Sequence, residues 1–393
     1  MTTLAASWAD GRPLPGRGGA PALRIEIADR LETVESRWRM LEQAGVLTPY
    51  GRYDWVAAFA ASGPGRVRVA VVADEAGRPS MILPLAVRSR FGVHTASVVG
   101  GRHANFVLPL MRPDFAAALA PARARELLRT IGRHMRADVL SLEGVPRTWD
   151  GDANPFADGG RPHASPAYSL VLDVDGPATL ARSMSGDARK KMRNKERGLA
   201  KSGTVELRLA RTPGDVDLIL DAFRVQKAAR FRELGIRDPF AGDELQAAIR
   251  RGCTERLAEG LPAIELYGLL LAGRPVAVLG GAADRRRFSS MFLSFENGEA
   301  ARFSPGDLLV ARVVADCCAR GLRVFDLGVG DARYKRAMCD GTEDLVDLVV
   351  PGTALGRAAG AALGVLGEAK RRAKADPRIV TLVARLRRGL ARG

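Results

Sequence analysis

One stretch decides the fold class of this chain: Ser304–Lys335, which reads SPGDLLVARVVADCCARGLRVFDLGVGDARYK. A serine followed by proline is typical of the first turn of a helix, and Gly321 marks the end of that helix. A short apolar strand follows and leads into Asp326 and a glycine-rich turn. The stretch therefore predicts a loop, a helix, a strand and a polar turn in succession.

Two interpretations of this stretch lead to different functions. It is either the loop, helix and strand that hold a thioester cofactor in acyltransferases, or the glycine-rich turn of a methyltransferase. The methyltransferase motif normally opens a doubly wound sheet, but only residues 336–393 follow here. Asp331 and Ala332 also stand where further glycine is expected. These observations favour the acyltransferase interpretation.

The chain contains the same order of elements twice. Each copy has a strand, an Ala-Gly-Arg-Pro turn and a second strand, at Arg66–Val87 and at Ala263–Ala283. A β-rich segment, a helix and a closing strand then follow, at Thr95–Val99, Ala122–Arg136 and Val139–Leu142, and at Phe288–Phe295, Asp307–Arg320 and Arg323–Leu327. This order predicts an α+β fold of two similar domains, each a mixed β-sheet flanked by helices.

Helices are expected to open each copy. They are Leu31–Gln43 and Trp55–Ala61 in the first copy and Asp215–Leu234 in the second, where Thr212 is the expected N-cap and Pro213 the first helical residue. A length of 393 residues also suggests two domains. We expect a flexible N-terminus at 1–20, an N-terminal domain at 21–150, a linker at 151–167, a C-terminal domain at 168–350 and a basic tail at 351–393.

The net charge of +16 is concentrated in two elements. Residues 351–393 carry ten Lys/Arg against two acidic residues, and residues 187–201 carry seven against two. The remainder is nearly neutral, so the charge predicts two local anionic contacts and not a long nucleic-acid groove.

The sequence gives no sign of a metal site, a disulfide framework or a membrane span. The four cysteines lack metal-ligand spacing and the four histidines are scattered. No apolar run reaches the length of a membrane span, and the N-terminus lacks the order of a secretory signal. We therefore expect a cytoplasmic protein without a metal.

Three blocks of the second half carry a family resemblance: GDARKKMRNKERGLAKSG (Gly186–Gly203), QKAARFRELGIRDPF (Gln226–Phe240), and SPGDLL with FDLGVGDARYK. They resemble the CelD/BcsL-type acyltransferases (BioF2-like acetyltransferase domain) of the GNAT superfamily, which are related to the FemABX peptidyltransferases. The resemblance implies two tandem GNAT-like domains and transfer of an acyl group from a thioester, most simply acetyl-CoA. It also implies an association with exopolysaccharide production.

One segment departs from this resemblance. The usual GNAT pyrophosphate loop has the form Arg/Gln-x-x-Gly-x-Gly/Ala, whereas this chain has ENGEAARFSPG at Glu296–Gly306. Two alternatives therefore stay open. One is a FemABX-like transferase that uses aminoacyl-tRNA, and the other is a non-catalytic accessory protein of polysaccharide synthesis.

The expected donor site is the start of the second-copy helix. A helix N-terminus has unpaired N–H groups and partial positive charge, so it can bind a cofactor pyrophosphate. The residues are Ser304, Pro305, Gly306 and Asp307, for which ordinary helix punctuation is the alternative.

The expected catalytic residues are Asp326, Tyr334 and Lys335, which follow the last strong strand. Tyr334 could protonate the leaving thiolate. Lys335 could bind an anionic acceptor or the cofactor phosphates. The alternative is that Asp326 caps a turn and Lys335 is a solvated surface charge.

The expected acceptor residues lie on two helices. Arg189, Arg193 and Arg197 recur every four residues and form a cationic ridge, which could clamp a phosphorylated or nucleotide-linked acceptor. Lys227 and Arg230, on the next helix, are expected to complete this pocket. A solvated charged face is the alternative for both helices.

These residues predict an acyltransferase that uses acyl-CoA and acts on an amine or hydroxyl, with a saccharide or nucleotide-sugar as the expected acceptor in exopolysaccharide or envelope biosynthesis. The basic tail is expected either to contact an anionic membrane surface or a membrane-bound synthase, or to be a solvated extension.

Overall fold

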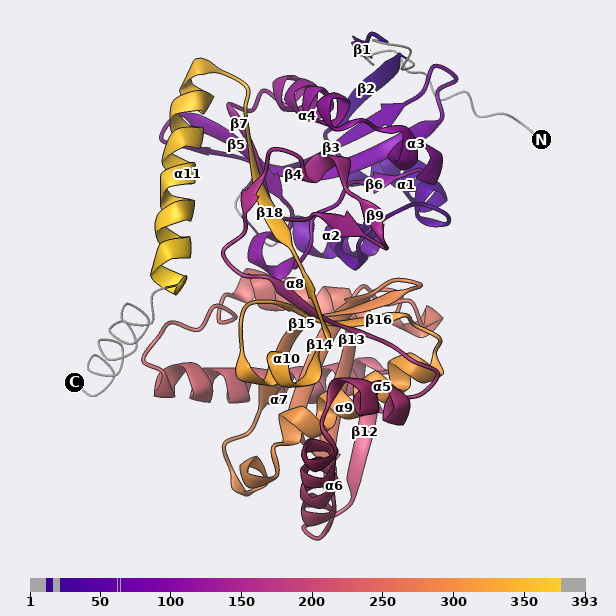
Figure 1. The fold of residues 1–393 in the computed structure, drawn as a ribbon, viewed down its shortest axis with the longest axis vertical. Helices are drawn as coiled ribbons and strands as arrows, with labels where there is room; N and C mark the ends of the chain where they lie inside the picture. Colours follow the sequence, from indigo (N-terminus) through magenta and orange to yellow (C-terminus); the bar gives the residue numbers. More distant parts are fainter. Residues whose placement is uncertain (1–11, 17–21, 62, 64, 376–393) are drawn as a thin grey trace. The chain divides into compact units, whose positions relative to one another are not determined.

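The computed structural model describes residues 12–16, 22–61, 63 and 65–375. The chain divides into two compact units (Figure 1). Unit 1 comprises Met1–Ala60, Pro64–His163 and Leu345–Gly367, and unit 2 comprises Ala61–Gly63, Ala164–Asp344 and Glu368–Gly393. Each has a mixed sheet flanked by helices, so the predicted α+β fold class is confirmed.

Unit 1 is built on a sheet of order β1-β2-β3-β4-β5-β7-β18-β10, in which β6 pairs with β4. Its strands are β1 (Arg12–Leu14), β2 (Leu23–Ala28), β3 (Arg66–Ala73), β4 (Pro79–Arg90), β5 (Val93–Val98), β6 (Leu110–Met111), β7 (Val139–Pro146), β10 (Arg161–Pro162) and β18 (Leu345–Pro351), with a separate hairpin of β8 (Thr148–Trp149) and β9 (Asp152–Ala153). Its helices are α1 (Glu35–Glu42), α2 (Tyr53–Ala60), α3 (Pro113–Ala118) and α4 (Pro121–His134), and α11 (Ala354–Ala375) follows β18.

Unit 2 is built on a sheet of order β12-β13-β14-β15-β16-β11-β17. The strands are β11 (Ala167–Val171), β12 (Val205–Leu209), β13 (Glu265–Leu271), β14 (Arg274–Ala283), β15 (Arg287–Phe295), β16 (Val324–Val329) and β17 (Gly341–Glu343). The helices are α5 (Gly176–Ser183), α6 (Gly186–Ala200), α7 (Pro213–Glu233), α8 (Asp243–Thr254), α9 (Pro305–Ala319) and α10 (Arg333–Met338).

The two sheets repeat one arrangement, as the sequence predicted. An antiparallel meander (β3-β4-β5 and β13-β14-β15) is followed by a helix (α4 and α9) and a strand that pairs in parallel with the end of the meander (β7 and β16). The shared Gly-Arg-Pro turns need glycine, since Gly77 and Gly273 have φ of 78° and 81°.

Each sheet also contains a strand from the other half of the sequence. β18, which follows the second copy, lies between β7 and β10 of unit 1, and β11, which follows the first copy, lies between β16 and β17 of unit 2. The range expected as a linker, 151–167, thus contains β10 and the first residue of β11, and the range 168–350 runs into a strand of unit 1. The sequence predicted a linker here because glycine, proline and aspartate favour turns. The strand β10 has only two residues, which is too short to show the alternating apolar pattern of a strand.

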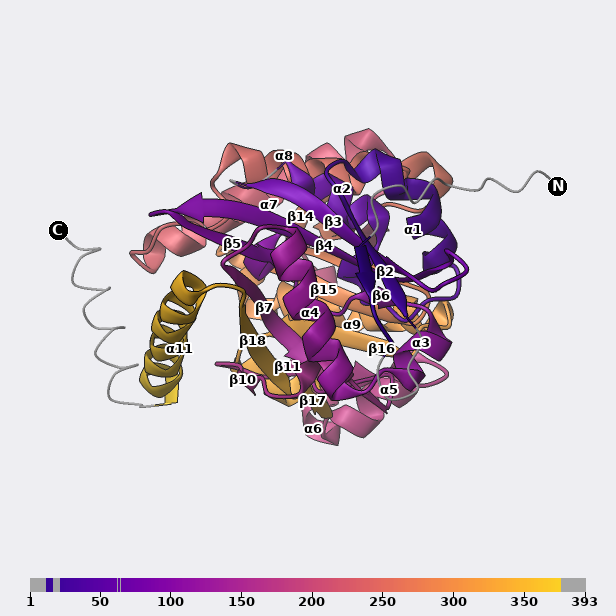
Figure 2. The ribbon, with the colours of Figure 1, turned by 90° about the horizontal axis from the view of Figure 1, so that it is seen from above.

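Opposite faces of the unit 2 sheet carry different helices. α9 and Leu199 of α6 pack on the face that bears Tyr267 and Leu269. α7 packs on the other face, where Gly268 leaves room for Ile219 and Gln226 donates a 3.1 Å hydrogen bond to the carbonyl of Pro275. In Figure 2, α7 and α8 lie on one side of unit 2, and α5 and α6 on the other. The expected cap of α7 is present, because Thr212 and Asp215 form a capping box.

Candidate functional site

The sheet of unit 2 opens between β15 and β16. These strands pair only through Arg287↔Val324, Phe288↔Phe325 and Ser289↔Asp326. Both strands are fully described, and past Ser289 and Asp326 they continue to Phe295 and Val329 without pairing with each other. Main-chain N–H and C=O groups along such an opening can pair with a linear ligand that carries amides.

The first turn of α9 lies beside this opening. A Cβ placed on Gly306 would come within 2.9 Å of the ring of Phe295, the last residue of β15. Ser304 has a left-handed φ of 51° and its hydroxyl does not cap the helix. That hydroxyl instead accepts a 2.6 Å hydrogen bond from Lys195 Nζ on α6. The start of α9 therefore combines the positive end of a helix with an ammonium group.

Asp307 and Tyr334 extend this cluster. Burial raises the pKa of the Asp307 carboxyl, and the nearby Lys195 opposes that rise. Tyr334, at the start of α10, has its pKa raised to about 12 by burial, with smaller contributions from Cys339 and Asp307. The phenol therefore remains protonated at neutral pH and can act as a proton donor. Sequence reasoning identified Ser304 and Tyr334 but missed Lys195.

Asp326 is fully buried on β16 beside the point where the strands part. It accepts hydrogen bonds from Ser289 Oγ at 3.0 Å and from the Gly328 N–H at 2.9 Å. Arg287 lies 3.7 Å from Asp326 and 2.9 Å from Glu343, so the two carboxylates share one guanidinium. Burial raises the pKa of Asp326 to about 7 despite Arg287. A carboxyl with this pKa is suited to accept a proton near neutral pH.

Lys335 is also buried, so it is not the solvated surface charge that the sequence left open as an alternative. Its Nζ donates 3.0 Å hydrogen bonds to the carbonyls of Gly328 and Val329, at the end of β16. Burial lowers the pKa of Lys335, and Asp326 partly offsets this. The side chain therefore fixes the turn that follows β16.

The cationic ridge lies on the face of the sheet that α9 covers. Arg193 and Arg197 are exposed and Arg189 is half-buried. Glu196 forms a 2.7 Å ion pair with Arg312 of α9, and Gly198 packs so closely on Phe303 that a Cβ would lie 2.5 Å from its ring. The ridge is thus held next to the start of α9.

Lys227 and Arg230 lie on α7, on the opposite face, so they do not complete a pocket with the ridge. Lys227 Nζ lies 5.2–5.9 Å from the ring centroids of Phe223, Phe231 and Phe240, and burial lowers its pKa. Arg230 is exposed and pairs with Glu233 at 3.4 Å. Helical periodicity predicts which residues share a helix face, but the sheet decides which helices share a face of the protein.

Unit 1 lacks these groups at the matching positions. In its parallel pair, Ser97↔Ser141 stands where unit 2 has Ser289↔Asp326. Arg123, in the first turn of α4, donates 2.9 Å and 3.4 Å hydrogen bonds to the carbonyls of residues 15 and 14. Through Arg123, residues 14 and 15 are therefore tied to the first turn of α4, the helix that corresponds to α9.

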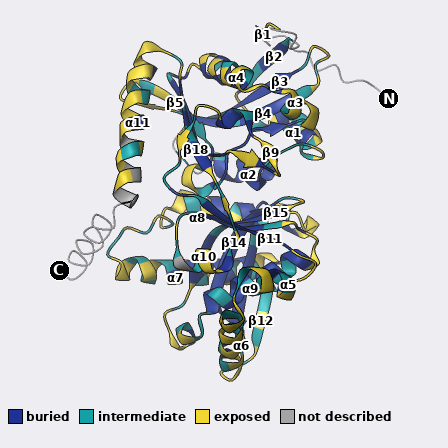
Figure 3. Cartoon of the chain, in the orientation of Figure 1, coloured by how far each residue is buried: buried dark blue, intermediate teal, exposed yellow. Residues whose placement is uncertain are grey.

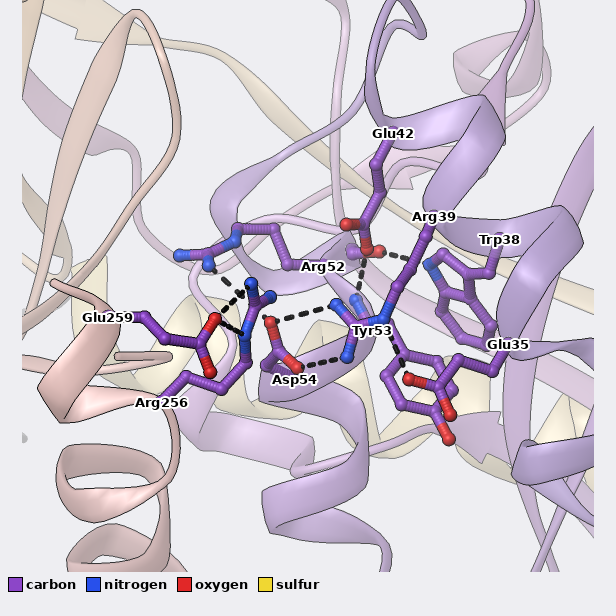
Figure 4. Close-up of polar contacts among 10 residues, drawn as sticks. Glu35, Trp38, Arg39, Glu42, Arg52, Tyr53, Asp54, Arg256 and Glu259 are labelled. Atoms are coloured by element: carbon purple, nitrogen blue, oxygen red, sulfur yellow. Dashed lines mark hydrogen bonds and ion pairs between the residues drawn. The ribbon is translucent and has the colours of Figure 1, made fainter. Parts of the chain in front are cut away.

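Unit 1 instead has a polar cluster that the sequence analysis did not identify (Figure 4). Arg39 of α1 forms a 2.7 Å ion pair with the buried Asp54 of α2 and another with Glu35. The backbone N–H of Tyr53 donates to Glu42, and burial raises the pKa of that carboxyl. These contacts join α1 to the first turn of α2.

The described part of the chain contains neither a cluster of metal ligands nor a helix suited to span a membrane. No group of three or more His, Cys, Asp or Glu in it is placed to hold a metal ion. Among the helices it contains, none is long and apolar enough to cross a membrane.

Comparison with known proteins identifies the fold. Residues 186–336 match the family described as "Acetyltransferase (GNAT) domain". The fold is similar to that of FemX (TM-score 0.57, 9% identity, 85% of this chain and 100% of that chain), and to that of L-PGS from Bacillus licheniformis (0.52, 11%, 85% and 96%). It is also similar to a conserved protein of unknown function from Bacteroides thetaiotaomicron (0.54, 12%, 83% and 99%). A search of curated proteins finds no match. Residues 186–336 therefore match a GNAT domain, and the fold of the whole chain is similar to that of FemX and L-PGS.

Proposed function

We propose that this protein, which has a GNAT-type acyltransferase fold, transfers an acyl group from acyl-CoA to an amine or hydroxyl acceptor in unit 2. One observation carries the proposal: β15 and β16 part beyond Ser289 and Asp326, beside the uncapped start of α9. The opening offers main-chain partners to a pantetheine arm, and the helix start offers N–H groups to a pyrophosphate.

Donor binding is assigned to the α6–α9 side. Lys195 and the N–H groups after Pro305 would hold the pyrophosphate, and the ridge of Arg189, Arg193 and Arg197 would neutralise the remaining phosphate charge. The sequence predicted that the ridge binds the acceptor, whereas we propose that it binds the donor. The reason is that the 2.6 Å contact of Lys195 with Ser304 fixes α6 beside α9.

Transfer would proceed by direct attack of the acceptor on the thioester carbonyl. Asp326 takes the proton that the acceptor nitrogen or oxygen releases, the carbon–sulfur bond breaks, and the Tyr334 hydroxyl gives a proton to the departing thiolate. Lys335 acts by holding the turn at Gly328 and Val329 in place. No covalent acyl-enzyme is required.

The acceptor is assigned to the α7 side, where Lys227 and Arg230 provide positive charge. An acceptor with an anionic group fits best, because such a group would offset the cost of burying the Lys227 ammonium. A nucleotide-linked or acidic saccharide has this chemistry, which agrees with a role in exopolysaccharide or envelope biosynthesis.

A FemABX-like use of aminoacyl-tRNA is the second candidate. It is favoured by the cationic ridge, since Arg193 and Arg197 are exposed and could contact a nucleic-acid backbone. The non-catalytic alternative is disfavoured by the buried Asp326, because burying a carboxyl whose pKa is raised to about 7 costs stability.

Calorimetric titration with acetyl-CoA and longer acyl-CoAs tests the proposal. We expect one site per chain with micromolar affinity, and weaker binding of 3′-dephospho-CoA. A Lys195→Ala variant controls for binding to basic surface elsewhere. No binding of any acyl-CoA, together with binding of aminoacyl-tRNA, would favour the second candidate. No binding of either would contradict transferase activity.

A further inference from the structure

Helix α11 contacts unit 1 through a row of glycines. A Cβ placed on Gly356 would lie 1.8 Å from the carbonyl oxygen of Asp138, and one on Gly364 would lie 2.0 Å from a guanidinium nitrogen of Arg161. Gly360, between them, faces Val349 of β18 at 3.1 Å. Thr353 Oγ1 donates a 2.7 Å hydrogen bond to Asp138 before the helix begins. Because these glycines recur every four residues, they lie on one side of α11, and that side faces the sheet of unit 1.

In the turns of α11 up to Gly367, the side away from the glycines is apolar and exposed. Val365 is 69% exposed and Leu355 50%, and both lie on the side away from the glycines. Leu363, at 41%, borders that side. Small exposed residues (Ala358, Ala361 and Ala362) fill the surface between them, and Figure 3 shows α11 as largely exposed. A helix with one attached side and one exposed apolar side is the pattern of a surface-binding helix.

Positive charge follows the apolar turns directly. The segment Glu368–Lys374 reads EAKRRAK, with four Lys/Arg against one Glu. Residues 351–393 together carry ten Lys/Arg against two acidic residues. An anionic lipid surface complements both features, since it accepts apolar side chains at its acyl boundary and attracts Lys and Arg at its headgroups.

We propose that the exposed side of α11 binds an anionic lipid surface, in the plane of the membrane and without crossing it. The four Lys/Arg that follow the apolar turns favour a lipid surface over an apolar protein groove, because anionic headgroups attract them. The glycine contacts orient the helix so that its apolar side points away from unit 1. The inference is independent of the proposed acyl transfer.

Vesicle co-sedimentation of the full chain tests the inference. The vesicles are equal parts phosphatidylglycerol and phosphatidylcholine, and pure phosphatidylcholine is the comparison. We expect binding to the anionic vesicles only, weakened by added salt. The double variant Leu355→Glu/Val365→Glu should lower the partition coefficient at least about tenfold, because it removes two apolar side chains from the interface.

A matched control distinguishes the loss of the apolar side of α11 from a general effect of added negative charge. Leu218 and Val225 on α7 are 40% and 70% exposed, so Leu218→Glu/Val225→Glu places two carboxylates at similar exposure on another helix. This control should bind vesicles like the parent chain. Equal loss in Leu218→Glu/Val225→Glu and in Leu355→Glu/Val365→Glu, or parental binding by the latter, would overturn the inference. Calorimetry with acetyl-CoA on the same samples shows whether the donor site is intact.

Discussion

Lys195 Nζ donates a 2.6 Å hydrogen bond to Ser304 Oγ, across 109 residues of sequence. The contact joins the most basic helix of unit 2 to the first turn of the helix that borders the strand opening. It places a fixed positive charge where the proposed donor has its phosphates. The donor site therefore depends on α6 as much as on the Ser-Pro-Gly-Asp turn.

Replacement of Lys195 tests that dependence. Lys195→Ala should weaken acyl-CoA binding about tenfold, because it removes a charge-assisted contact to phosphate. Calorimetry gives the dissociation constant. Lys191→Ala is the control, since Lys191 is exposed on the same helix and its loss changes the net charge equally. Equal weakening in both variants would mean that only overall charge attracts the donor.

Tyr334 should affect the chemical step and not donor binding. Tyr334→Phe removes the hydroxyl that protonates the thiolate, so kcat should fall about 100-fold while KM for acyl-CoA stays unchanged. Release of the CoA thiol with hydroxylamine as a surrogate amine acceptor measures both. Tyr168→Phe is the control, since the Tyr168 hydroxyl donates to Asp331 at 2.9 Å and has no proposed chemical role. Parental turnover in Tyr334→Phe would remove Tyr334 from the mechanism.

Asp326 should make stability depend on pH. Its pKa is about 7 in the folded chain, against about 4 for an unfolded aspartate. Between these values the folded state binds more protons, so stability falls as pH rises from about 4 to about 7 and then levels off. Asp326→Asn should remove up to about 4 kcal/mol of this decline. Denaturant unfolding from about pH 5 to pH 8 measures it.

A companion variant identifies the cause of that pH dependence. Glu343→Gln removes a carboxylate whose charge raises the pKa of Asp326, so it should lower that pKa and move the decline to lower pH. If Asp326 is the base, the acid limb of kcat/KM moves in the same direction. An unchanged pH dependence of stability in Asp326→Asn would show that this carboxyl does not titrate in the range.

Lys335 should contribute to stability. Lys335→Ala removes the hydrogen bonds that Lys335 donates to the carbonyls of Gly328 and Val329 and should cost about 1–3 kcal/mol. Arg336→Ala, at the exposed neighbouring position, should cost less than about 0.5 kcal/mol. Thermal unfolding compares the two. A neutral Lys335→Ala that loses acceptor binding would instead support the direct role expected from sequence.

The strand β18 should stabilise unit 1, although it follows unit 2 in sequence. Val346 is fully buried and pairs with Val145 and Pro162, so Val346→Ala should cost about 2 kcal/mol. Trp38, Trp55 and Trp149 all lie in unit 1, so tryptophan fluorescence reports its unfolding. Val225→Ala, at an exposed position, should have almost no effect. Equal stability of both variants would contradict a structural role for β18 in unit 1.

Local sequence determined much of the fold. Thr212, Pro213 and Asp215 define the start of α7 through contacts within one turn, and the two Ala-Gly-Arg-Pro turns define two hairpins. The order of helices and strands along the chain then predicted two similar mixed sheets. These features depend on residues close together in the chain, which is why the sequence alone was sufficient for them.

Only the tertiary structure decided which distant residues meet. Ser289 and Asp326 become neighbours because β15 and β16 pair in parallel across α9, and Lys195 reaches Ser304 because α6 packs beside α9. Lys227 lies on the other face of the sheet from the ridge, which helical periodicity does not encode. The placement of β18 and β11 likewise depends on backbone hydrogen bonds, which any apolar strand can form. Sequence therefore determined the elements and the candidate groups, and long-range packing determined the site.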